Sequence, residues 1–298
     1  MLLVLGDGLL GSVIKNKHTI TLTKKEINLE KDSLDKIKKR IFYTNPIMNL
    51  DPPFPTNINY PENTYLINAA GYTDVDGAET NQDKAYKTNT EGVYKLAVVC
   101  KQLGVTLLHI STDFVFDGIS RTPFSEYDQL NPVNYYGYTK MMSEKMIMNS
   151  GCKYAIIRAG WLYDACNGLI PKLINKVIED KPLFGVQDQR LSPTHVRDLS
   201  KQIFKIIENN LTGVFHATTD GWTTPVDLLK LISKNIHGEE REVWTSNKCN
   251  FLTSGAQRPL NCVLDNMNLK ALGLNILPHW KEGVLSLLEK PENDKKTK

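Results

Sequence analysis

The sequence predicts an α/β fold in which a doubly wound parallel sheet is accompanied by a smaller C-terminal lobe. The chain opens on an apolar run, Met1 to Leu5, that ends at a glycine-rich turn, as expected for a strand buried on both faces. Short apolar segments then alternate with helical segments up to about residue 160, which is typical of parallel strands joined by crossover helices. Beyond that point the alternation is less regular, so most of the lobe is expected there.

The elements can be placed in chain order from apolar periodicity and from glycine and proline. Strands are expected at 1–5, 19–22, 65–68, 106–110, 154–158 and 214–217, and helices at 8–15, 31–42, 81–103, 136–149, 168–179, 196–208 and 225–236. Five prolines between residues 43 and 63 predict a long surface loop. The charged residues 289–298 are expected to be disordered.

The composition excludes several classes of function. A net charge of +3, from 36 basic and 33 acidic residues, gives no basis for nucleic acid or a membrane surface as partner. Five cysteines, an odd number without a C-x-x-C pair, favour free thiols in the cytoplasm. The six scattered histidines predict no metal site. The opening apolar run is too short for a signal peptide or a membrane span.

A glycine-rich turn follows the first predicted strand. Gly6, Gly8 and Gly11 form a G-x-G-x-x-G motif, whose glycines allow a tight turn, close approach of a pyrophosphate and close packing of the next helix. Leu9 and Leu10 would open that helix, whose first N–H groups can bind the phosphate. The motif therefore predicts a dinucleotide site in a Rossmann-type domain.

The end of the second strand indicates which dinucleotide binds. An acidic residue there would bind the ribose hydroxyls of NAD, but Thr23 and Lys24 occupy this region. A hydroxyl and a lysine suit the 2′-phosphate of NADP, so NADP is favoured and NAD remains the alternative. We therefore assign residues 1–160, with a return near 190–220, to an NADP-binding domain, and residues 161–288 mainly to a substrate-binding lobe.

A tyrosine and a lysine are spaced for catalysis. Tyr136 and Lys140 lie four residues apart in a predicted helix, so they share one face. A lysine ammonium stabilises a phenolate, which lets the tyrosine exchange a proton with a carbonyl oxygen. Tyr138 has no such partner, because residue 142 is a methionine. Thr112 follows the strand at 106–110, at the sheet edge where ligands bind, and its hydroxyl can bond the carbonyl.

Several segments, in the same order, resemble dTDP-4-dehydrorhamnose reductases, which are extended short-chain dehydrogenase/reductases. They are NAAGYTDVD at 68–76, ISTDFVFDG at 110–118, YGYTK at 136–140 with Glu144, RAGWLY at 158–163, PT at 193–194, and RPLN at 258–261 with LD at 264–265. The resemblance implies NADPH-dependent reduction at C4 of a 4-keto-6-deoxy sugar carried on a nucleoside diphosphate. The nucleotide, dTDP or UDP, stays open.

The same resemblance implies roles for particular residues. Thr112, Tyr136 and Lys140 would be the catalytic set. The cofactor would be lined by Ala69, Ala70 and Gly71 in addition to the catalytic pair, and the sugar by Val75, Phe114, Trp161 and Arg258.

Two features depart from the family pattern. The glycine turn is one residue shorter than the usual G-x-x-G-x-x-G. Phe114 stands where these reductases mostly carry a tyrosine, so a hydroxyl contact to the sugar is lost. Related bifunctional 3-epimerase/4-reductases tend to have a cysteine there, which favours reduction without epimerisation.

A second resemblance leaves a different class of function open. PTHVRD at 193–198 and GAQRP at 255–259 are similar to the regulatory β subunit of methionine adenosyltransferase, which binds NADP and acts as a partner protein. The segments around Thr73 and Trp161 resemble the reductases instead, so the enzyme is the favoured interpretation. A homodimer is one assembly that the chain could form.

Overall fold

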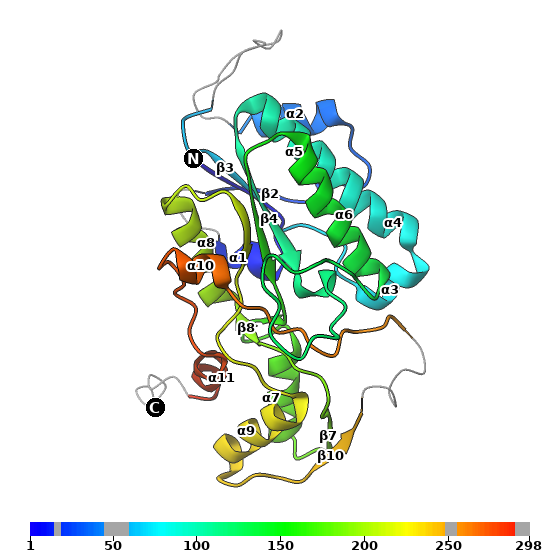
Figure 1. Ribbon diagram of the computed structural model, residues 1–298, viewed down its shortest axis with the longest axis vertical. Helices are drawn as coiled ribbons and strands as arrows, with labels where there is room; N and C mark the ends of the chain where they lie inside the picture. The colour runs from blue at the N-terminus through cyan, green and yellow to red at the C-terminus, as the bar shows by residue number, and fades with distance from the viewer. Residues whose placement is uncertain (15–18, 45–59, 248–254, 290–298) are drawn as a thin grey trace, which may run out of the picture.

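The structure is a computed structural model that describes residues 1–14, 19–44, 60–247 and 255–289. Its centre is a six-stranded sheet (Figure 1) in the order β2-β1-β3-β4-β5-β9, in which every neighbouring pair is parallel. The strands are β1 (Leu2–Leu5), β2 (Thr19–Leu22), β3 (Tyr65–Asn68), β4 (Thr106–Thr112), β5 (Tyr154–Ala159) and β9 (Gly213–His216). The predicted parallel α/β fold is therefore confirmed.

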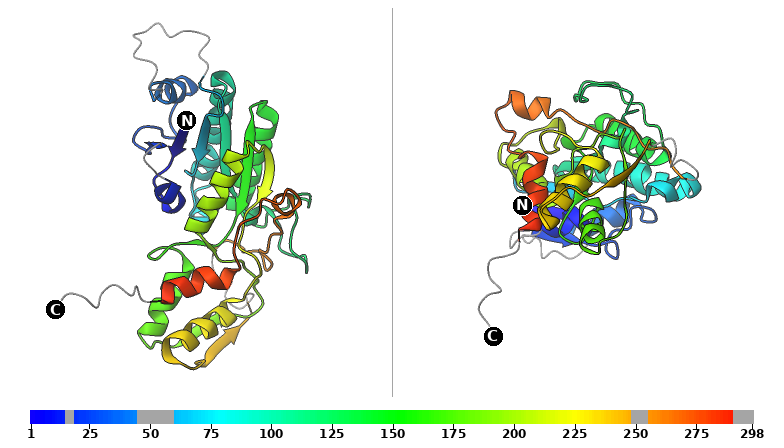
Figure 2. Two further views of the ribbon diagram at one scale, coloured as in Figure 1. Left: turned by 90° about the vertical axis from the view of Figure 1, so that its left-hand side faces the viewer. Right: turned by 90° about the horizontal axis from the view of Figure 1, so that it is seen from below.

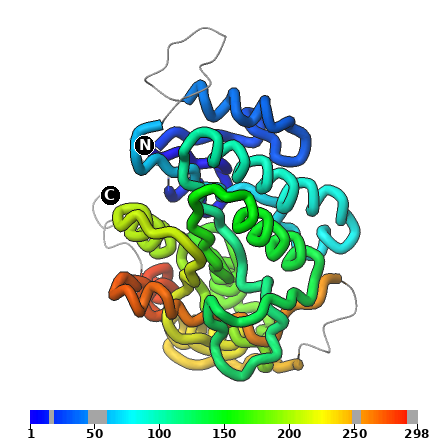
Figure 3. The backbone as a smooth tube through the Cα atoms, turned by 45° about the horizontal axis from the view of Figure 1, so that its top comes forward, coloured from blue at the N-terminus to red at the C-terminus, as the bar shows by residue number. Residues whose placement is uncertain are grey.

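Helices cover both faces of this sheet. On one face α2 (Leu34–Phe42), α5 (Gly92–Leu103) and α6 (Tyr135–Ser150) lie side by side (Figure 3). On the other face α1 (Leu9–Ile14) packs on α8 (Val196–Glu208). Alternate residues of one strand enter different cores: Leu3 and Leu5 pack toward α2 and α5, whereas Val4 packs toward α1 and α8. This alternation explains why the strand is apolar throughout.

A smaller lobe lies below the sheet (Figure 2). It contains α7 (Leu169–Ile178), α9 (Pro225–His237), α11 (Trp280–Leu288) and a two-stranded parallel sheet of β7 (Leu183–Val186) and β10 (Val243–Ser246). Tyr163, Val226 and Trp280 belong to its buried apolar core. Three further short elements are present: β6 (Leu162–Tyr163) pairs with β8 (Thr194–His195) in a separate two-stranded sheet, and α10 (Met267–Ala271) packs on β9 of the main sheet.

The predicted helix at 81–103 is wrong as a single element. The structure has α3 (Val75–Thr80), α4 (Gln82–Tyr86), a π-helical turn η1 (Lys87–Glu91) and then α5. The wider π turn buries Asn89 and Thr90 against α6, where Thr90 donates to the Thr139 carbonyl oxygen. Buried polar residues with hydrogen-bond partners therefore interrupt the regular α-helical periodicity here. Such π turns within helices often lie near functional sites.

The helix predicted at 31–42 begins at Leu34, because the Ser33 hydroxyl accepts a hydrogen bond from the Lys36 amide and caps it. Most of the loop predicted at 43–63, and residues 290–298 of the predicted tail, lie outside the described residues. In the described part of the chain, no helix is long and apolar enough to cross a membrane.

Candidate active site

A cavity of about 640 Å³ opens where the strand order reverses between β1 and β3. Such switch points, beyond the carboxyl ends of parallel strands, are where doubly wound sheets bind ligands, and the volume suits a small molecule or cofactor. Fourteen of the predicted site residues line it: Gly6, Gly8, Leu9, Leu10, Lys24, Ala69, Ala70, Gly71, Val75, Thr112, Phe114, Tyr136, Lys140 and Trp161. Gly11, Thr23 and Arg258 do not.

The glycine turn is shaped for close approach of a ligand. Gly6 has φ +107, and a Cβ there would lie 2.9 Å from the Ala70 amide nitrogen. A Cβ on Gly11 would lie 2.2 Å from the Gly6 carbonyl oxygen, so α1 packs against β1 only without it. A Cβ on Gly8 would meet no atom within 4 Å, which leaves open space above the turn. The turn thus fits a dinucleotide pyrophosphate.

The residues after β2 divide in their roles. Lys24 lines the cavity, as expected for a residue near the adenosine end of a dinucleotide. Thr23 turns away: its amide donates to Glu26 Oε2 at 2.7 Å and its hydroxyl to the same oxygen at 3.1 Å. Thr23 therefore stabilises a turn. Of these two residues, Lys24 is the one that remains a candidate contact to the 2′-phosphate.

Helix α6 presents Tyr136 to the cavity. The Asn134 side chain caps the helix by accepting from the Gly137 amide at 2.7 Å. The pKa of Tyr136 is raised to about 12, mainly by burial and to a smaller extent by the Asp113 carboxylate, and a hydrogen bond from Thr112 limits the rise. The phenol therefore keeps its proton at neutral pH and is ready to donate it.

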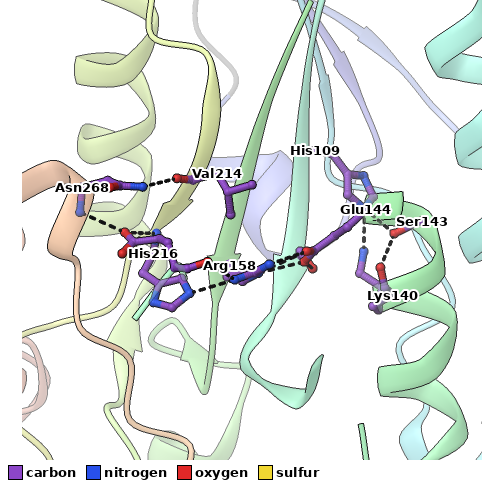
Figure 4. Close-up of polar contacts among 10 residues, drawn as sticks. His109, Lys140, Ser143, Glu144, Arg158, Val214, His216 and Asn268 are labelled. Carbon is purple, nitrogen blue, oxygen red and sulfur yellow. Dashed lines mark hydrogen bonds and ion pairs between the residues drawn. The ribbon is translucent and has the colours of Figure 1, made fainter. Parts of the chain in front are cut away.

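Lys140 lies one turn further along α6 and is buried. Its Nζ donates to the Ile110 carbonyl oxygen at 2.6 Å and lies 3.1 Å from His109 Nε2 (Figure 4). Burial lowers the pKa of Lys140 to about 8, while Glu144 opposes this shift. The side chain is thus oriented by backbone, and its ammonium form predominates at neutral pH.

The hydrogen bonds of His109 determine its tautomer. Asn68 Oδ1 accepts from the Ala70 amide at 3.1 Å, so the Asn68 NH₂ group faces His109 Nδ1 at 3.0 Å. Nδ1 is therefore an acceptor, and the ring proton belongs on Nε2, which lies 3.1 Å from Ser143 Oγ. Burial, and secondarily Lys140, lower the pKa of His109 well below its usual value. A neutral ring thus lies beside the candidate catalytic lysine.

Thr112 is held by its neighbours at the end of β4. Its Oγ1 accepts from the Phe114 amide at 3.3 Å and lies 3.0 Å from Asp113 Oδ1. Asp113 is 2% exposed, and burial raises its pKa to about 7. Its Oδ2 is buried and has no hydrogen-bond partner among the described residues. The candidate hydroxyl is therefore coupled to a carboxyl group that titrates near neutrality.

Trp161 follows β5 and lines the same cavity as the glycine turn. Its backbone has φ 52, which is rare for a bulky residue and concentrates at functional sites. Its Nε1 is buried and lacks a hydrogen-bond partner in the described ranges. The indole N–H is thus a buried donor beside the cavity that no described residue satisfies.

Arg258 is not among the residues that line the cavity. Its guanidinium forms an ion pair with Asp76, with Nη2 2.6 Å from Oδ2, and Asp76 also accepts from the Ala256 amide at 2.9 Å. Hydrogen bonding to Arg258 lowers the pKa of Asp76 to about 2. Asp76 therefore anchors the segment that begins at residue 255, and Arg258 serves this contact rather than lining the cavity.

A buried ion pair between Glu144 and Arg158 connects α6 to β5. Glu144 accepts two bonds from Arg158 Nε at 3.1 Å and one from Nη2 at 2.7 Å, and it also accepts from the Ser111 hydroxyl. Arg158 continues to His216 Nε2 at 3.3 Å (Figure 4). The network links α6, β4, β5 and β9, and it meets α6 at Glu144, one turn beyond Lys140. In the described ranges, no group of His, Cys, Asp and Glu side chains could hold a metal ion.

Three residues near the site were not predicted: Asn89, His109 and Asp113. Asn89 accepts from the Tyr72 amide at 2.8 Å and donates to Thr139 at 3.0 Å, from a π turn that sequence periodicity does not reveal. His109 is a polar residue inside a predicted apolar strand, and this exception to the apolar pattern could have marked it as a site residue. Asp113 adjoins Thr112, but its burial depends on Gly160, where a Cβ would lie 2.2 Å from Asp113 Oδ2.

Comparison with known proteins finds one family. The family model described as the RmlD substrate binding domain matches residues 54–292. A dTDP-4-keto-6-deoxy-D-glucose reductase of Streptomyces niveus is 31% identical over 222 residues, which cover 73% of this chain and 76% of the relative. A dTDP-4-dehydrorhamnose reductase of Mycobacterium tuberculosis is 28% identical over 235 residues, covering 76% and 77%.

Solved structures agree with this comparison. The dTDP-4-dehydrorhamnose reductase of Bacillus anthracis, crystallised in complex with NADP, superposes with a TM-score of 0.83 at 26% identity, over 96% of this chain and 97% of that one. The protein from Clostridium acetobutylicum described as a dTDP-4-dehydrorhamnose reductase also has a TM-score of 0.83, at 29% identity, over 96% and 98%.

Proposed function

Because the chain belongs to the RmlD substrate binding domain family, we propose that it reduces the C4 ketone of a nucleoside-diphosphate 4-keto-6-deoxyhexose. NADPH is the reductant, and the product is a rhamnose-type 6-deoxy-L-sugar nucleotide. The observation that carries the proposal is that Thr112, Tyr136 and Lys140 line the same cavity as the glycine turn. The relatives named above are reductases of such sugars, and one was crystallised with NADP.

The cofactor would be held at the glycine turn and by Ala69, Ala70 and Gly71, with Lys24 toward the 2′-phosphate and Lys140 toward the ribose. When bound, NADPH supplies a hydride to the ketone carbon. In this proposal residues 1–160, with the return near 190–220, form the cofactor domain, and residues 161–288 mainly form the substrate-binding lobe.

The chain itself supplies the proton and the stabilisation of charge. Tyr136 donates its phenolic proton to the oxygen that becomes an alkoxide. The Lys140 ammonium stabilises the phenolate that remains, because the site is buried and electrostatic attraction is strong there. The Thr112 hydroxyl donates a hydrogen bond to the same oxygen. Together these groups favour the transition state over the bound ketone.

The sugar would lie between Val75, Phe114 and Trp161, which line the cavity. Phe114 packs edge-on against Tyr136, with ring centroids 6.1 Å apart. It has no ionisable group, so it cannot abstract or return a proton at C3 or C5. We therefore propose reduction without epimerisation.

An NADP-binding regulatory subunit without turnover is the alternative, and the named relatives do not favour it. The cytoplasmic location and the homodimer remain predictions. Sedimentation of the purified chain would measure its oligomeric state.

Oxidation of NADPH tests the proposal. Purified protein is mixed with NADPH and freshly prepared dTDP- or UDP-4-keto-6-deoxyhexose, and the loss of NADPH absorbance is followed. We expect turnover with at least one sugar, and a fall of at least about 10²-fold in kcat for Tyr136→Phe, which cannot donate the proton. Tyr138→Phe on the same helix is the matched control, since Tyr138 is 38% exposed. No turnover with either sugar would refute the enzyme.

A further inference from the structure

Asp113 is a buried acid that the proposed mechanism leaves without a role. It follows Thr112 directly and lines the same cavity. One carboxyl oxygen lies 3.0 Å from Thr112 Oγ1, and the other is buried without a hydrogen-bond partner among the described residues. Polar groups in such a position are costly to bury, and a charged carboxylate is costlier than a neutral acid. The geometry therefore already favours the protonated form.

The Thr112 hydroxyl has one proton to donate. If Asp113 is a carboxylate, that proton is directed to Asp113 Oδ1, and Thr112 presents a lone pair to the cavity. A lone pair would repel a ketone oxygen that gains negative charge. If Asp113 is protonated, it donates to Thr112 Oγ1, and the Thr112 proton turns from Asp113 toward the Tyr136 phenol and the ketone. The Phe114 amide, 3.3 Å from Oγ1, holds the hydroxyl oxygen in place in both cases.

We propose that Asp113 acts as a neutral carboxylic acid that donates to Thr112 and so directs the Thr112 proton to the ketone oxygen. It is a positioning residue, since it acts through Thr112, and the inference rests on the proposed function. No covalent bond changes: the hydrogen bonds form a chain from Asp113 through Thr112 to the ketone. Such chains strengthen each bond in them.

The charge balance at Tyr136 supports the same assignment. A carboxylate at Asp113 raises the pKa of Tyr136, which opposes formation of the phenolate when Tyr136 gives up its proton. A neutral Asp113 removes this repulsion. Thr112 and Tyr136 therefore both assist the reaction better when Asp113 is protonated than when it is a carboxylate.

The groups that face Asp113 set the pH range. Burial raises its pKa to about 7, whereas Thr112, backbone amides and the nearby Cys262 thiol favour the charged form and lower it. From α6 the facing titratable group is the Tyr136 phenol, and after β5 Gly160 brings no side chain. No basic side chain forms an ion pair with Asp113 in the described ranges. The active form therefore exists below about pH 7 and is lost as the pH rises through that value.

Two substitutions separate this role from a structural one. Asp113→Asn keeps a donor toward Thr112 but cannot titrate, whereas Asp113→Leu removes the donor at similar volume. The dependence of kcat/KM on pH is measured from about pH 5 to about pH 9 for both variants and the wild type. For the wild type we expect a decline beginning near pH 7. For Asp113→Asn we expect a plateau that declines only near pH 8, where Lys140 loses its proton.

Asp113→Leu should be slower by about 10²-fold at every pH, as for loss of one donor to a developing oxyanion. The inference is overturned if Asp113→Asn is as slow as Asp113→Leu, or if it keeps the decline near pH 7 while the wild type turns over. The proposed function itself fails if the wild type oxidises no NADPH with either sugar.

A second measurement does not depend on turnover. The protein is labelled with ¹³C at aspartate carboxyls, and the resonance missing from Asp113→Asn is followed against pH. We expect a midpoint near 7. A midpoint in the ordinary aspartate range, near about 4, would overturn the neutral acid at Asp113.

Discussion

Two histidines with no solvent exposure, His109 and His216, show how single residues make the fold depend on pH. His216 Nδ1 lies 3.1 Å from the Phe124 carbonyl oxygen and 3.0 Å from that of Asp265, so it carries the ring proton. Nε2 must then accept from Arg158. Burial lowers the pKa of His216 to about 3, and the Arg158 charge adds to the effect. Both rings are therefore neutral in the folded chain.

Acid should destabilise the protein through these rings. An unfolded histidine has a pKa of about 6.5, so below that value the unfolded chain binds more protons than the folded one. Stability is thus lost as the pH falls below about 6.5, and each ring costs about 2 kcal/mol of unfolding free energy between pH 7 and pH 5. Urea unfolding at both pH values measures this loss.

The variant His216→Gln can still donate and accept but does not titrate. It should be less stable at pH 7. Between pH 7 and pH 5 its loss of unfolding free energy should be about 2 kcal/mol smaller than that of the wild type, which is the contribution of one buried histidine. His237→Gln, at an exposed histidine that ends α9, is the control and should keep the wild-type slope. An unchanged slope in His216→Gln would contradict the neutral ring.

At the scale of elements, β1 and α1 are joined by a turn whose glycines have different tasks. Gly11 lets the helix pack on the strand, because a Cβ there would lie 2.2 Å from a backbone oxygen. Gly8 faces open space within 4 Å. The same sequence motif thus contains one glycine required for packing and one that leaves room for a ligand.

Two alanine substitutions should separate these tasks. Gly11→Ala should destabilise the fold by about 1–3 kcal/mol, as overpacking does, and should weaken NADPH binding as well. Gly8→Ala should unfold at the wild-type temperature but bind NADPH more weakly, because its methyl group enters the space for the pyrophosphate. Thermal unfolding and titration calorimetry measure the two effects. Equal losses of stability in both variants would contradict the assignment.

The elements also show how far sequence reasoning reaches. Apolar periodicity, with glycine and proline, predicted all six strands of the main sheet and placed α8 at Val196–Glu208. The short strands β6 and β8, two residues each, have no period to detect and form through tertiary pairing. The break in the helix at 81–103 arises from the Asn89 contacts to Tyr72 and Thr139, which exist only once distant segments meet.

At the scale of the whole molecule, one exposed ion pair joins α3 of the main domain to the segment after residue 254. Asp76 directly follows Val75, a cavity residue, and binds both Arg258 and the Ala256 amide. Asn134, the cap of α6, also donates to the Gln257 carbonyl oxygen at 2.7 Å. These contacts tie one wall of the cavity to the C-terminal half of the chain.

Arg258→Met should therefore affect the sugar more than the fold. Exposed ion pairs contribute about 1 kcal/mol or less to stability, so the unfolding temperature should change little. The KM for the sugar should rise several-fold as the wall loosens, because small misplacements weaken productive binding. Lys87→Met, in the exposed pair with Asp83, is the control. An unchanged KM in Arg258→Met, or an equal loss of NADPH affinity, would contradict the link.

The destination of the hydride tests the central claim most directly. The chain is given NADPH that carries deuterium at the transferable position of the nicotinamide, together with the 4-keto-6-deoxy-L-hexose nucleotide, and the product is examined by NMR. We predict one deuterium at C4 of a 6-deoxy-L-sugar. In a parallel reaction in deuterated water, C3 and C5 should keep their hydrogen and gain no deuterium. A sugar without deuterium at C4 would contradict reduction by this site.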